Sequence, residues 1–414
     1  MDPVDAAEQA GAAEAASEAP CEVTIVAHDV GGVGGMERQL AELVLGLRRL
    51  GHEVSVIAWT CDLPRDGEGA ADAGVAFHRV RGPRRPFLVG YPAFMLAGSL
   101  VLRRRRRGIV QATGAIVLGR VDTVAIHCCH QVYRAAPTRS TRLAGSYTRL
   151  LGLIKRVAER AFVRANRSAT FVCVSDGVAE EMREHYPEIV DRVVTIHNGV
   201  DTRAFAPDTR AREARGLRAK LDIPAECLIA AFVARGWGHK GLGSVIEALP
   251  HAPGWDLVVA GDGDRRRYEG LAMSLGVSGR VRWLGVVGDI QTVYELADAF
   301  VLPSSYETFS LVTFEAAASG LPILATAVNG VRELLVDGEN GFQITPEPAV
   351  IAERMNRLSA NSGRRREMGR AARRATLAFG WEEMVAEHHE LYMRQRQAVF
   401  TNLSHYPKSS GACD

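Results

Sequence analysis

The pattern of apolar and polar positions opens the chain as a strand, a glycine-rich loop, a helix and a second strand. Residues 22–27 form a short apolar run, and the segment 31–35 that follows carries four glycines. Leucine and valine then recur at positions 40, 43, 44 and 47, the spacing of one helix face. Gly51 ends the pattern, and residues 54–59 form the next apolar run. This order is typical of parallel α/β proteins.

Further apolar runs divide the chain into two such series. The first half continues with predicted strands at residues 75–80, 109–112, 123–126, 169–174 and 193–196. The second half has predicted strands at residues 228–234, 256–260, 281–284, 299–302 and 322–326, with helices between them. We therefore predict an α/β protein in which two Rossmann-like domains face each other across a cleft.

The predicted boundaries follow from changes in composition. They are a disordered acidic tail at 1–20, an N-terminal Rossmann-like domain at 21–197, a C-terminal one at 198–379, a crossover helix at 380–400 that packs back on the first domain, and a loose tail at 401–414. The first tail has neither a cationic start nor an apolar segment, so it does not have the character of a secretory leader. We therefore expect a cytoplasmic protein.

Composition excludes several classes of function. The 414 residues are too many for one ordinary core, and the net charge of +2 gives no reason to expect a nucleic-acid partner. Seven scattered cysteines include no CxxC pair, which disfavours a zinc site or a disulfide framework. Cys128 and Cys129 lie between His127 and His130, but adjacent strand residues point to opposite faces, which disfavours a metal site there as well.

Two glutamates eight positions apart are the most informative polar residues. Glu307 follows the predicted strand at 299–302, and Glu315 lies inside the helix that comes next. Ligands of open α/β sheets bind in the crevice at the carboxyl ends of the strands, and a helix start there offers N–H groups to a phosphate. Two acceptors beside an anion site suit a ligand with hydroxyls at both ends of a diphosphate.

Two cations occupy the same position after another strand. Arg235 and Lys240 follow the strand at 228–234, among three glycines that allow close backbone approach. An arginine fork and a lysine point charge suit a diphosphate. The alternative is a solvated loop in which the charges occur by chance. The glycines near residue 32 do not meet the dinucleotide fingerprint, because Glu37 replaces its last glycine and no acid ends the second strand, which disfavours NAD.

The series of motifs in the second half resembles the family 4 glycosyltransferases, retaining enzymes of the GT-B fold. The resemblance extends from about residue 22 to 395 and is dense from 228 to 342. It rests on Arg235 with Lys240-Gly241, on the segments 259–263 and 284–285, on Glu307 with Glu315, on Gly320-Leu321-Pro322 and on Asn198-Gly199-Val200-Asp201.

The resemblance implies a role for each candidate residue. Arg235 and Lys240 would hold the donor diphosphate, Glu307 would contact the donor sugar, and Glu315 would accept hydrogen bonds from the ribose. The remaining donor-binding candidates are Gly34, Gly35, Gly285 and the backbone of Phe309, Ser310 and Leu311. The family usually has glycine where this chain has Ser310, from which we expect only a small effect. Either His127 or His130 would lie near the acceptor; the order of residues after His130 favours that one, and a purely structural histidine is the alternative for each.

The predicted activity is transfer of a hexose from a nucleotide sugar, with UDP favoured only by its frequency in the family. The expected acceptor is a glycan or a lipid-linked glycan, and the expected product is an α-glycoside. No Asp-x-Asp element stands out, and the cations can replace a metal, so we expect no metal and no other cofactor. The alternatives are an epimerase-like GT-B enzyme, a catalytically silent sugar-nucleotide-binding protein and, more distantly, an oxidoreductase.

An uncharged segment and a run of arginines precede the strand at 109–112. Residues 86–102 carry no charge, and five arginines follow: Arg103, Arg104, Arg105, Arg106 and Arg107. A core helix with a basic carboxyl end is one interpretation. The other is contact with an anionic membrane surface, which would place the protein peripherally on the inner face of the membrane.

Overall fold

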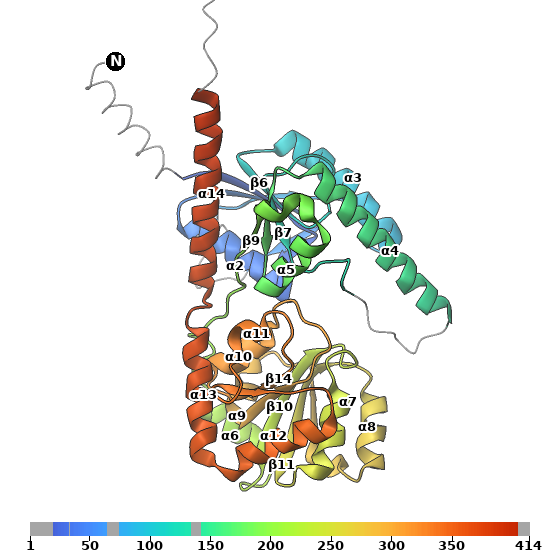
Figure 1. The fold of residues 1–414 in the computed structure, drawn as a ribbon, viewed down its shortest axis with the longest axis vertical. Helices are drawn as coiled ribbons and strands as arrows, with labels where there is room; N and C mark the ends of the chain where they lie inside the picture. The colour runs from blue at the N-terminus through green and yellow to red at the C-terminus, as the bar shows by residue number, and fades with distance from the viewer. Residues whose placement is uncertain (1–19, 33, 64–73, 134–141, 405–414) are drawn as a thin grey trace, which may run out of the picture.

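The structure, a computed structural model, describes residues 20–32, 34–63, 74–133 and 142–404. The predicted tail at 1–20 therefore lies, apart from Pro20, outside the described residues. Figure 1 shows two α/β domains stacked along the long axis, with a long helix running beside the first. The fold class predicted from the sequence is confirmed.

The first domain is built on a parallel sheet of seven strands. Its order is β5 (Ala76–Arg79), β3 (Glu53–Ala58), β1 (Glu22–Val26), β6 (Ile109–Thr113), β7 (Thr123–Ile126), β8 (Thr170–Cys173) and β9 (Val193–Thr195). The residues of β6 and β7 are all buried, as expected for parallel strands covered on both faces. A small pair, β2 (Asp29–Gly31) and β4 (Thr60–Asp62), extends beyond β1 and β3.

The second domain has a parallel sheet of six strands. Its order is β12 (Val281–Gly285), β11 (Trp255–Asp262), β10 (Leu228–Arg235), β13 (Ala299–Leu302), β14 (Ile323–Ala325) and β15 (Gly341–Gln343). The strand order reverses at β10: β11 and β12 lie on one side of this strand, and β13 lies on the other. Such a switch point creates a crevice at the carboxyl ends of the strands.

The helices that bear on the site come from both domains. In the first they are α2 (Gly35–Arg49), α3 (Phe87–Arg105), α4 (Arg142–Ala165) and α5 (Asp176–His185). In the second they are α6 (Ala211–Lys220), α7 (Leu242–Ala248), α8 (Arg265–Ser274), α9 (Ile290–Leu296), α10 (Leu311–Ala318), α11 (Val331–Leu334), α12 (Pro348–Ala360) and α13 (Ser362–Thr376). Helices α12 and α13 are divided at Asn361, whose side chain caps α13.

The final helix, α14 (Trp381–Ser404), returns to the first domain. It packs on α2, where Gly46 allows close approach, because a side chain there would meet Val385. Tyr392 donates a hydrogen bond of 2.7 Å to Gln111 of β6. The helix includes residues 401–404, so the loose tail predicted from 401 is wrong for these four residues; residues 405–414 lie outside the described part.

Candidate functional site

The predicted cations and the first glutamate meet at the switch point of the second sheet. Arg235 is the last residue of β10, Lys240 lies in the loop after it, and Glu307 lies in the loop after β13. Lys240 Nζ is 2.6 Å from Glu307 Oε1, and the two side chains are only 19% and 8% exposed. Ser304 Oγ donates a second hydrogen bond of 2.7 Å to the same oxygen. The sequence prediction that Lys240 and Glu307 share one site agrees with this geometry.

A glycine allows these two loops to touch. Gly241 has φ of +79°, and a Cβ at this position would lie 2.4 Å from the carbonyl oxygen of Pro303. Any other residue would therefore be strained by its backbone and would collide with the neighbouring loop. The Lys240 loop can approach the Glu307 loop only because position 241 has no side chain.

Arg235 lies beside this pair but is held loosely. Its side chain is 71% exposed, and its contacts with Asp262 at the end of β11 are 3.4 Å long. Gly285 lies farther away, at the end of β12 and two strands from β10. Both residues lie at the carboxyl ends of their strands, as predicted, and the guanidinium of Arg235 is exposed to solvent.

The start of α10 has an unusual backbone. Ser310 caps the helix in the left-handed conformation, with φ of 73°, and its hydroxyl lies 2.8 Å from that of Thr313. The left-handed conformation gives a physical reason for glycine at this position, since a side chain there costs roughly 1–2 kcal/mol. Phe309 is buried and stacks on Phe314 at 4.1 Å, which fixes the loop from which the helix begins.

Glu315 is buried in the second domain and paired with the first. Arg38 of α2 lies 2.8 Å from its Oε1, and the buried Tyr294 of α9 donates a hydrogen bond of 3.0 Å to Oε2. Burial raises the pKa of Glu315, while Arg38 and the Tyr294 hydrogen bond act in the opposite direction. Neither partner could be predicted from the sequence, because Arg38 and Tyr294 lie on other helices.

The glycine loop of the first domain faces the start of α10. Gly34 caps α2 with φ of 97°, and a Cβ on Gly35 would lie 3.2 Å from Leu311. The α2 start and the α10 start therefore oppose each other across the domain boundary. Gly34, Gly35 and Leu311 are thus brought together.

The two candidate histidines both follow β7 but have different neighbours. His127 Nε2 is buried and has no hydrogen-bond partner among the described residues; burial lowers its pKa to about 4, helped by His388 of α14. Burial also lowers the pKa of His130 to about 4, helped by Lys155 of α4. Among the described residues, neither ring makes a hydrogen bond or ion pair with Glu307, so which histidine serves the site stays a prediction.

The loop carrying His130 nevertheless reaches the second domain. Tyr133 packs edge-on against Tyr306, with ring centroids 5.4 Å apart. Tyr306 also donates a hydrogen bond of 3.0 Å to Glu181 of α5. Since Tyr306 directly precedes Glu307, both contacts fix the Glu307 loop from the first domain.

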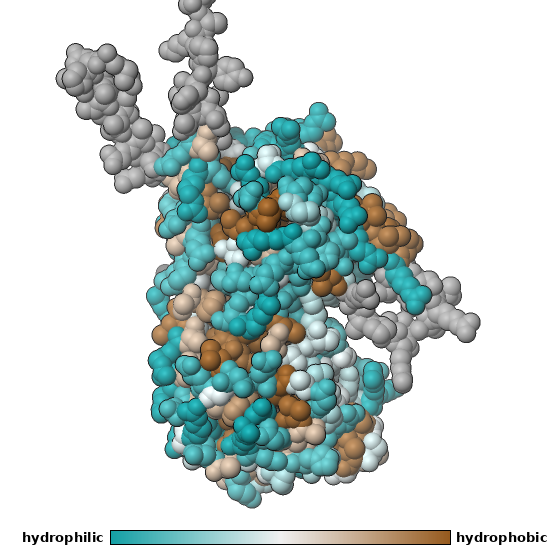
Figure 2. Space-filling view, viewed as in Figure 1, coloured by the Kyte–Doolittle hydropathy of each residue, from teal (hydrophilic) through white to brown (hydrophobic). Residues whose placement is uncertain are grey.

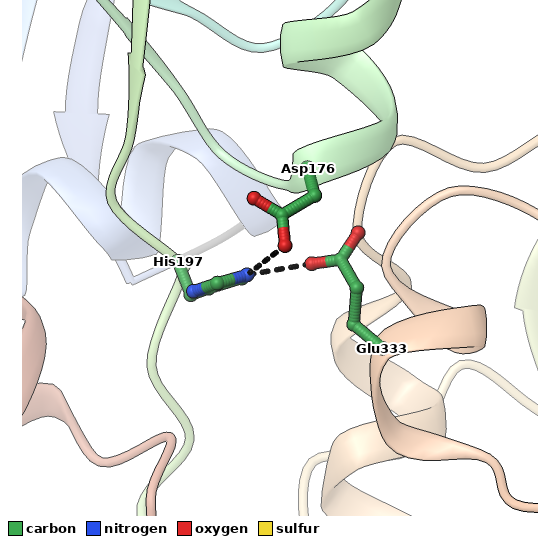
Figure 3. Close-up of side chains that lie close together, drawn as sticks. All are labelled: Asp176, His197 and Glu333. Atoms are coloured by element: carbon green, nitrogen blue, oxygen red, sulfur yellow. Dashed lines mark ion pairs between the residues drawn. The ribbon is translucent and has the colours of Figure 1, made fainter.

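A second interdomain contact involves His197, which follows β9. Its Nε2 lies 2.6 Å from Glu333 of α11 and 3.8 Å from Asp176 of α5, and Figure 3 shows the ring directed at both carboxylates. Burial opposes the charged ring, but Glu333, Asp176 and Glu387 outweigh it and raise the pKa of His197. Glu333 Oε1 also accepts hydrogen bonds from the backbone N–H groups of Gly177 and Gly330. We call Asp176, His197 and Glu333 the hinge triad.

The hinge triad is the one group of metal-ligand type found among the described residues. The His127 to His130 segment forms no such group there. A positively charged His197 ring beside two carboxylates is enough to account for this cluster, so the triad needs no ion to explain it.

Comparison with known proteins agrees with this architecture. Residues 33–204 match the model of "Glycosyltransferase Family 4", and residues 214–375 match that of "Glycosyl transferases group 1". The chain belongs to the glycosyltransferases. The two matched regions fall on the two domains, with the Glu307 and Lys240 site inside the second.

Several relatives align over nearly all of this glycosyltransferase. An uncharacterised glycosyltransferase of Methanocaldococcus jannaschii is 29% identical over 377 residues, covering 87% of this chain and 94% of its own. D-inositol 3-phosphate glycosyltransferase of Xylanimonas cellulosilytica is 29% identical over 394 residues, covering 87% and 92%. A lipopolysaccharide core biosynthesis glycosyltransferase of Rhizobium meliloti is 35% identical over 174 residues, covering 42% and 48%.

Solved structures share the fold. WaaG, a glycosyltransferase involved in lipopolysaccharide biosynthesis, superposes with a TM-score of 0.73 at 20% identity, covering 89% of this chain and 99% of its own. HepE of Anabaena, solved with UDP and glucose, gives a TM-score of 0.69 at 18% identity, covering 90% and 99%. These likenesses establish a GT-B architecture.

Proposed function

We propose that this protein is a retaining glycosyltransferase that moves a hexose from a nucleoside-diphosphate sugar to a hydroxyl acceptor and forms an α-glycoside. The observation that carries the proposal is the shielded Lys240–Glu307 pair, at 2.6 Å, beside the start of α10. One group is a cation and the other an acceptor. Together they offer what the diphosphate and the sugar hydroxyls of such a donor require.

The chemistry places the main demand on the leaving group. When the anomeric C–O bond breaks, negative charge grows on the diphosphate, and preformed cations and N–H groups stabilise it. Lys240 and the exposed Arg235 supply the cations, and the backbone at Ser310 and Leu311 supplies the N–H groups. Glu307 accepts hydrogen bonds from the sugar, and Glu315 accepts them from the ribose. These groups need no metal, and we propose catalysis without one.

The donor can be identified by binding and turnover. UDP-, GDP- and ADP-sugars are screened by thermal shift, where a ligand at 100 times its Kd adds about 2.7 kcal/mol of stability. UDP-glucose is the first choice, because HepE was solved with it. Turnover of the donor that binds is then followed by mass spectrometry with Glu307→Gln as the comparison. Binding without turnover in the presence of glycan acceptors would favour the silent binding protein.

The acceptor is proposed to be a glycan or a lipid-linked glycan. Relatives are named for inositol 3-phosphate and for the lipopolysaccharide core, both polyhydroxylated compounds. A membrane-bound acceptor would require the enzyme to reach a lipid surface. No helix of the described residues is both long and apolar enough to cross a membrane.

Helices α3 and α4 carry the surface that suits peripheral attachment. They lie together on one side of the first domain, where Lys155 of α4 approaches the ring of Phe87 on α3 (Figure 1). Apolar side chains gather on the surface there (Figure 2). We define the apolar stripe by the exposed residues Val89, Leu96, Leu100, Leu150, Leu153 and Val157.

The stripe is bordered by positive charge. Arg103, Arg104 and Arg105 are exposed at the end of α3, and Arg149 and Arg160 are exposed along α4. Arg106 and Arg107 are different, since they pair with Asp122 and Glu22. Among the described residues, no ion pair is found for the other three arginines of the predicted run. Exposed apolar residues next to arginines suit an anionic bilayer, where each basic residue contributes about 1 kcal/mol. We propose that the stripe docks on such a bilayer.

Vesicle sedimentation tests this part of the proposal. We expect binding to vesicles with anionic lipid and weaker binding to neutral ones. The double variant Leu96→Ser with Leu153→Ser should lose most of the binding and keep donor turnover on a soluble acceptor. Unchanged sedimentation of that variant would refute the docking surface while leaving the transferase assignment intact.

A further inference from the structure

Arg38 connects the two domains at the buried end of the donor site. It comes from the second turn of α2 in the first domain, and its guanidinium lies 2.8 Å from Glu315 in the second. Its Cζ is also 5.8 Å from the ring of Phe205 and 5.9 Å from that of Trp381, the first residue of α14. Arg38 therefore lies where both domains and the crossover helix meet.

The hydrogen bonds of Glu315 leave part of its carboxylate open. Oε1 accepts from Arg38 and Oε2 from Tyr294. An ionised carboxylate has about four acceptor positions, so about two stay available. These match the two neighbouring hydroxyls of a ribose. Arg38 and Tyr294 each hold one oxygen of the carboxylate, which fixes its orientation.

The charge of Glu315 depends on the first domain. The side chain is 9% exposed, and burial by itself favours the protonated form. Arg38 is the cation that opposes this effect. A protonated carboxyl would carry an O–H donor in place of one acceptor. Without Arg38, Glu315 would thus lose part of its capacity to accept hydrogen bonds.

We propose that Arg38 is a positioning residue for the nucleoside end of the donor: it reaches across the cleft and holds Glu315 charged and oriented toward the ribose. The inference rests on the proposed function, in which Glu315 contacts that ribose. It adds that domain closure and nucleotide binding depend on the same ion pair. A nucleotide that needs an ionised Glu315 favours the closed arrangement, and closure strengthens nucleotide binding by the same factor.

Calorimetric titration with UDP, GDP and ADP from pH 5.5 to 8.5 tests the inference. At each pH the Kd of a variant is divided by that of the wild type, which cancels the titration of the diphosphate itself. For Arg38→Met we expect binding about 10-fold weaker than that of the wild type at pH 7.5. As the pH falls and Glu315 of the variant takes up a proton, the Kd ratio should rise further, by up to about tenfold per pH unit. Arg38→Lys keeps a cation and should stay within about threefold. Arg49→Met, an exposed arginine of the same helix, is the matched control.

Glu315→Gln separates the positioning role from a structural one. Glu315→Gln should weaken nucleotide binding, and its Kd relative to that of the wild type should be the same at every pH, because the amide does not titrate. Adding Arg38→Met to Glu315→Gln should change the Kd by less than about threefold. The double variant also removes both charges of the ion pair, so no unpaired carboxylate is left buried and it stays folded where Arg38→Met alone fails to fold.

The possible failures are distinguishable. If no nucleotide binds the wild type, the proposed function is wrong and the inference falls with it. If Glu315→Gln weakens binding while Arg38→Met leaves the Kd ratio near 1 at every pH, the proposed function stands and only the role of Arg38 is refuted. A large effect of Arg38→Met on top of Glu315→Gln would also refute it.

Discussion

Replacing Lys240 by methionine removes the positive charge of the Lys240–Glu307 pair while keeping most of the volume of the lysine side chain. Glu307 would retain only the Ser304 hydrogen bond at its paired oxygen, and its side chain is 8% exposed. Removing one partner of a buried ion pair typically costs about 3–5 kcal/mol. Because Lys240 itself is partly accessible, we expect the lower end, about 3 kcal/mol, at pH 7.

A second substitution tests whether the unpaired charge causes the loss of stability. Glu307→Gln introduced together with Lys240→Met should restore stability, because no charge is left unpaired.

Activity should respond differently from stability. Loss of a group that stabilises the leaving charge lowers the rate by about 100- to 1000-fold, and the double variant should not recover it. Stability is measured by thermal and urea unfolding at pH 5.5 and 7.0, and rate by single-turnover donor consumption, with the exposed Lys220→Met as control. A rate within threefold of the wild type for Lys240→Met, or a rate restored by the second substitution, would contradict the role assigned to Lys240.

Three further predictions concern the hinge triad, the α10 start and metals. The pKa of His197 is raised in the folded protein, so the charged ring stabilises the fold fully below the pKa of the unfolded state, and this stabilisation is lost as pH rises through the pKa of the folded state. The difference in melting temperature between the wild type and His197→Gln should therefore shrink from pH 6 to 9. A constant difference would exclude the charged contact. Ser310→Gly relieves the strain of a serine in the left-handed conformation, worth roughly 1–2 kcal/mol, but removes the hydrogen bond to Thr313, worth about 1 kcal/mol. The free energy of unfolding, measured with urea, should therefore change by less than about 1 kcal/mol. Ser310→Val should lower the free energy of unfolding by more than about 2 kcal/mol. Dialysis against EDTA should leave the transfer rate unchanged, and recovery of a lost rate by Mn²⁺ or Mg²⁺ alone would overturn the proposal of catalysis without metal.

Strands and loops of the second domain were predictable because their signals are local. The apolar run at 299–302 is β13 to the residue, and the run at 228–234 is β10 without its last residue, Arg235. Parallel strands are buried on both faces, so their apolar runs are continuous and end where polar loop residues begin. The same logic placed Lys240 and Glu307 on one edge of the sheet before their contact was known.

Helices α3 and α4 show where local signals fail. The uncharged segment at 86–102 was compatible with a core helix or with a membrane contact, since both are apolar. Leu96 is 64% exposed, so part of α3 does not lie in the core. Nothing in the sequence of a helix states which neighbour covers it, and the pairing of Arg106 with Asp122 depends on the position of β7.

The sequence by itself determined the succession of strands and helices along each half, the glycine loops and the residues that carry charge at the carboxyl ends of the second sheet. These properties follow from periodicity and from residue type, which act over a few neighbouring positions. Only the tertiary structure decided that Arg38 contacts Glu315, that His197 lies between two carboxylates from different domains, and that Tyr306 donates a hydrogen bond to Glu181 of α5. Their partners are more than 100 residues apart or on separate elements, and such contacts arise only when the two domains and the returning helix α14 pack together.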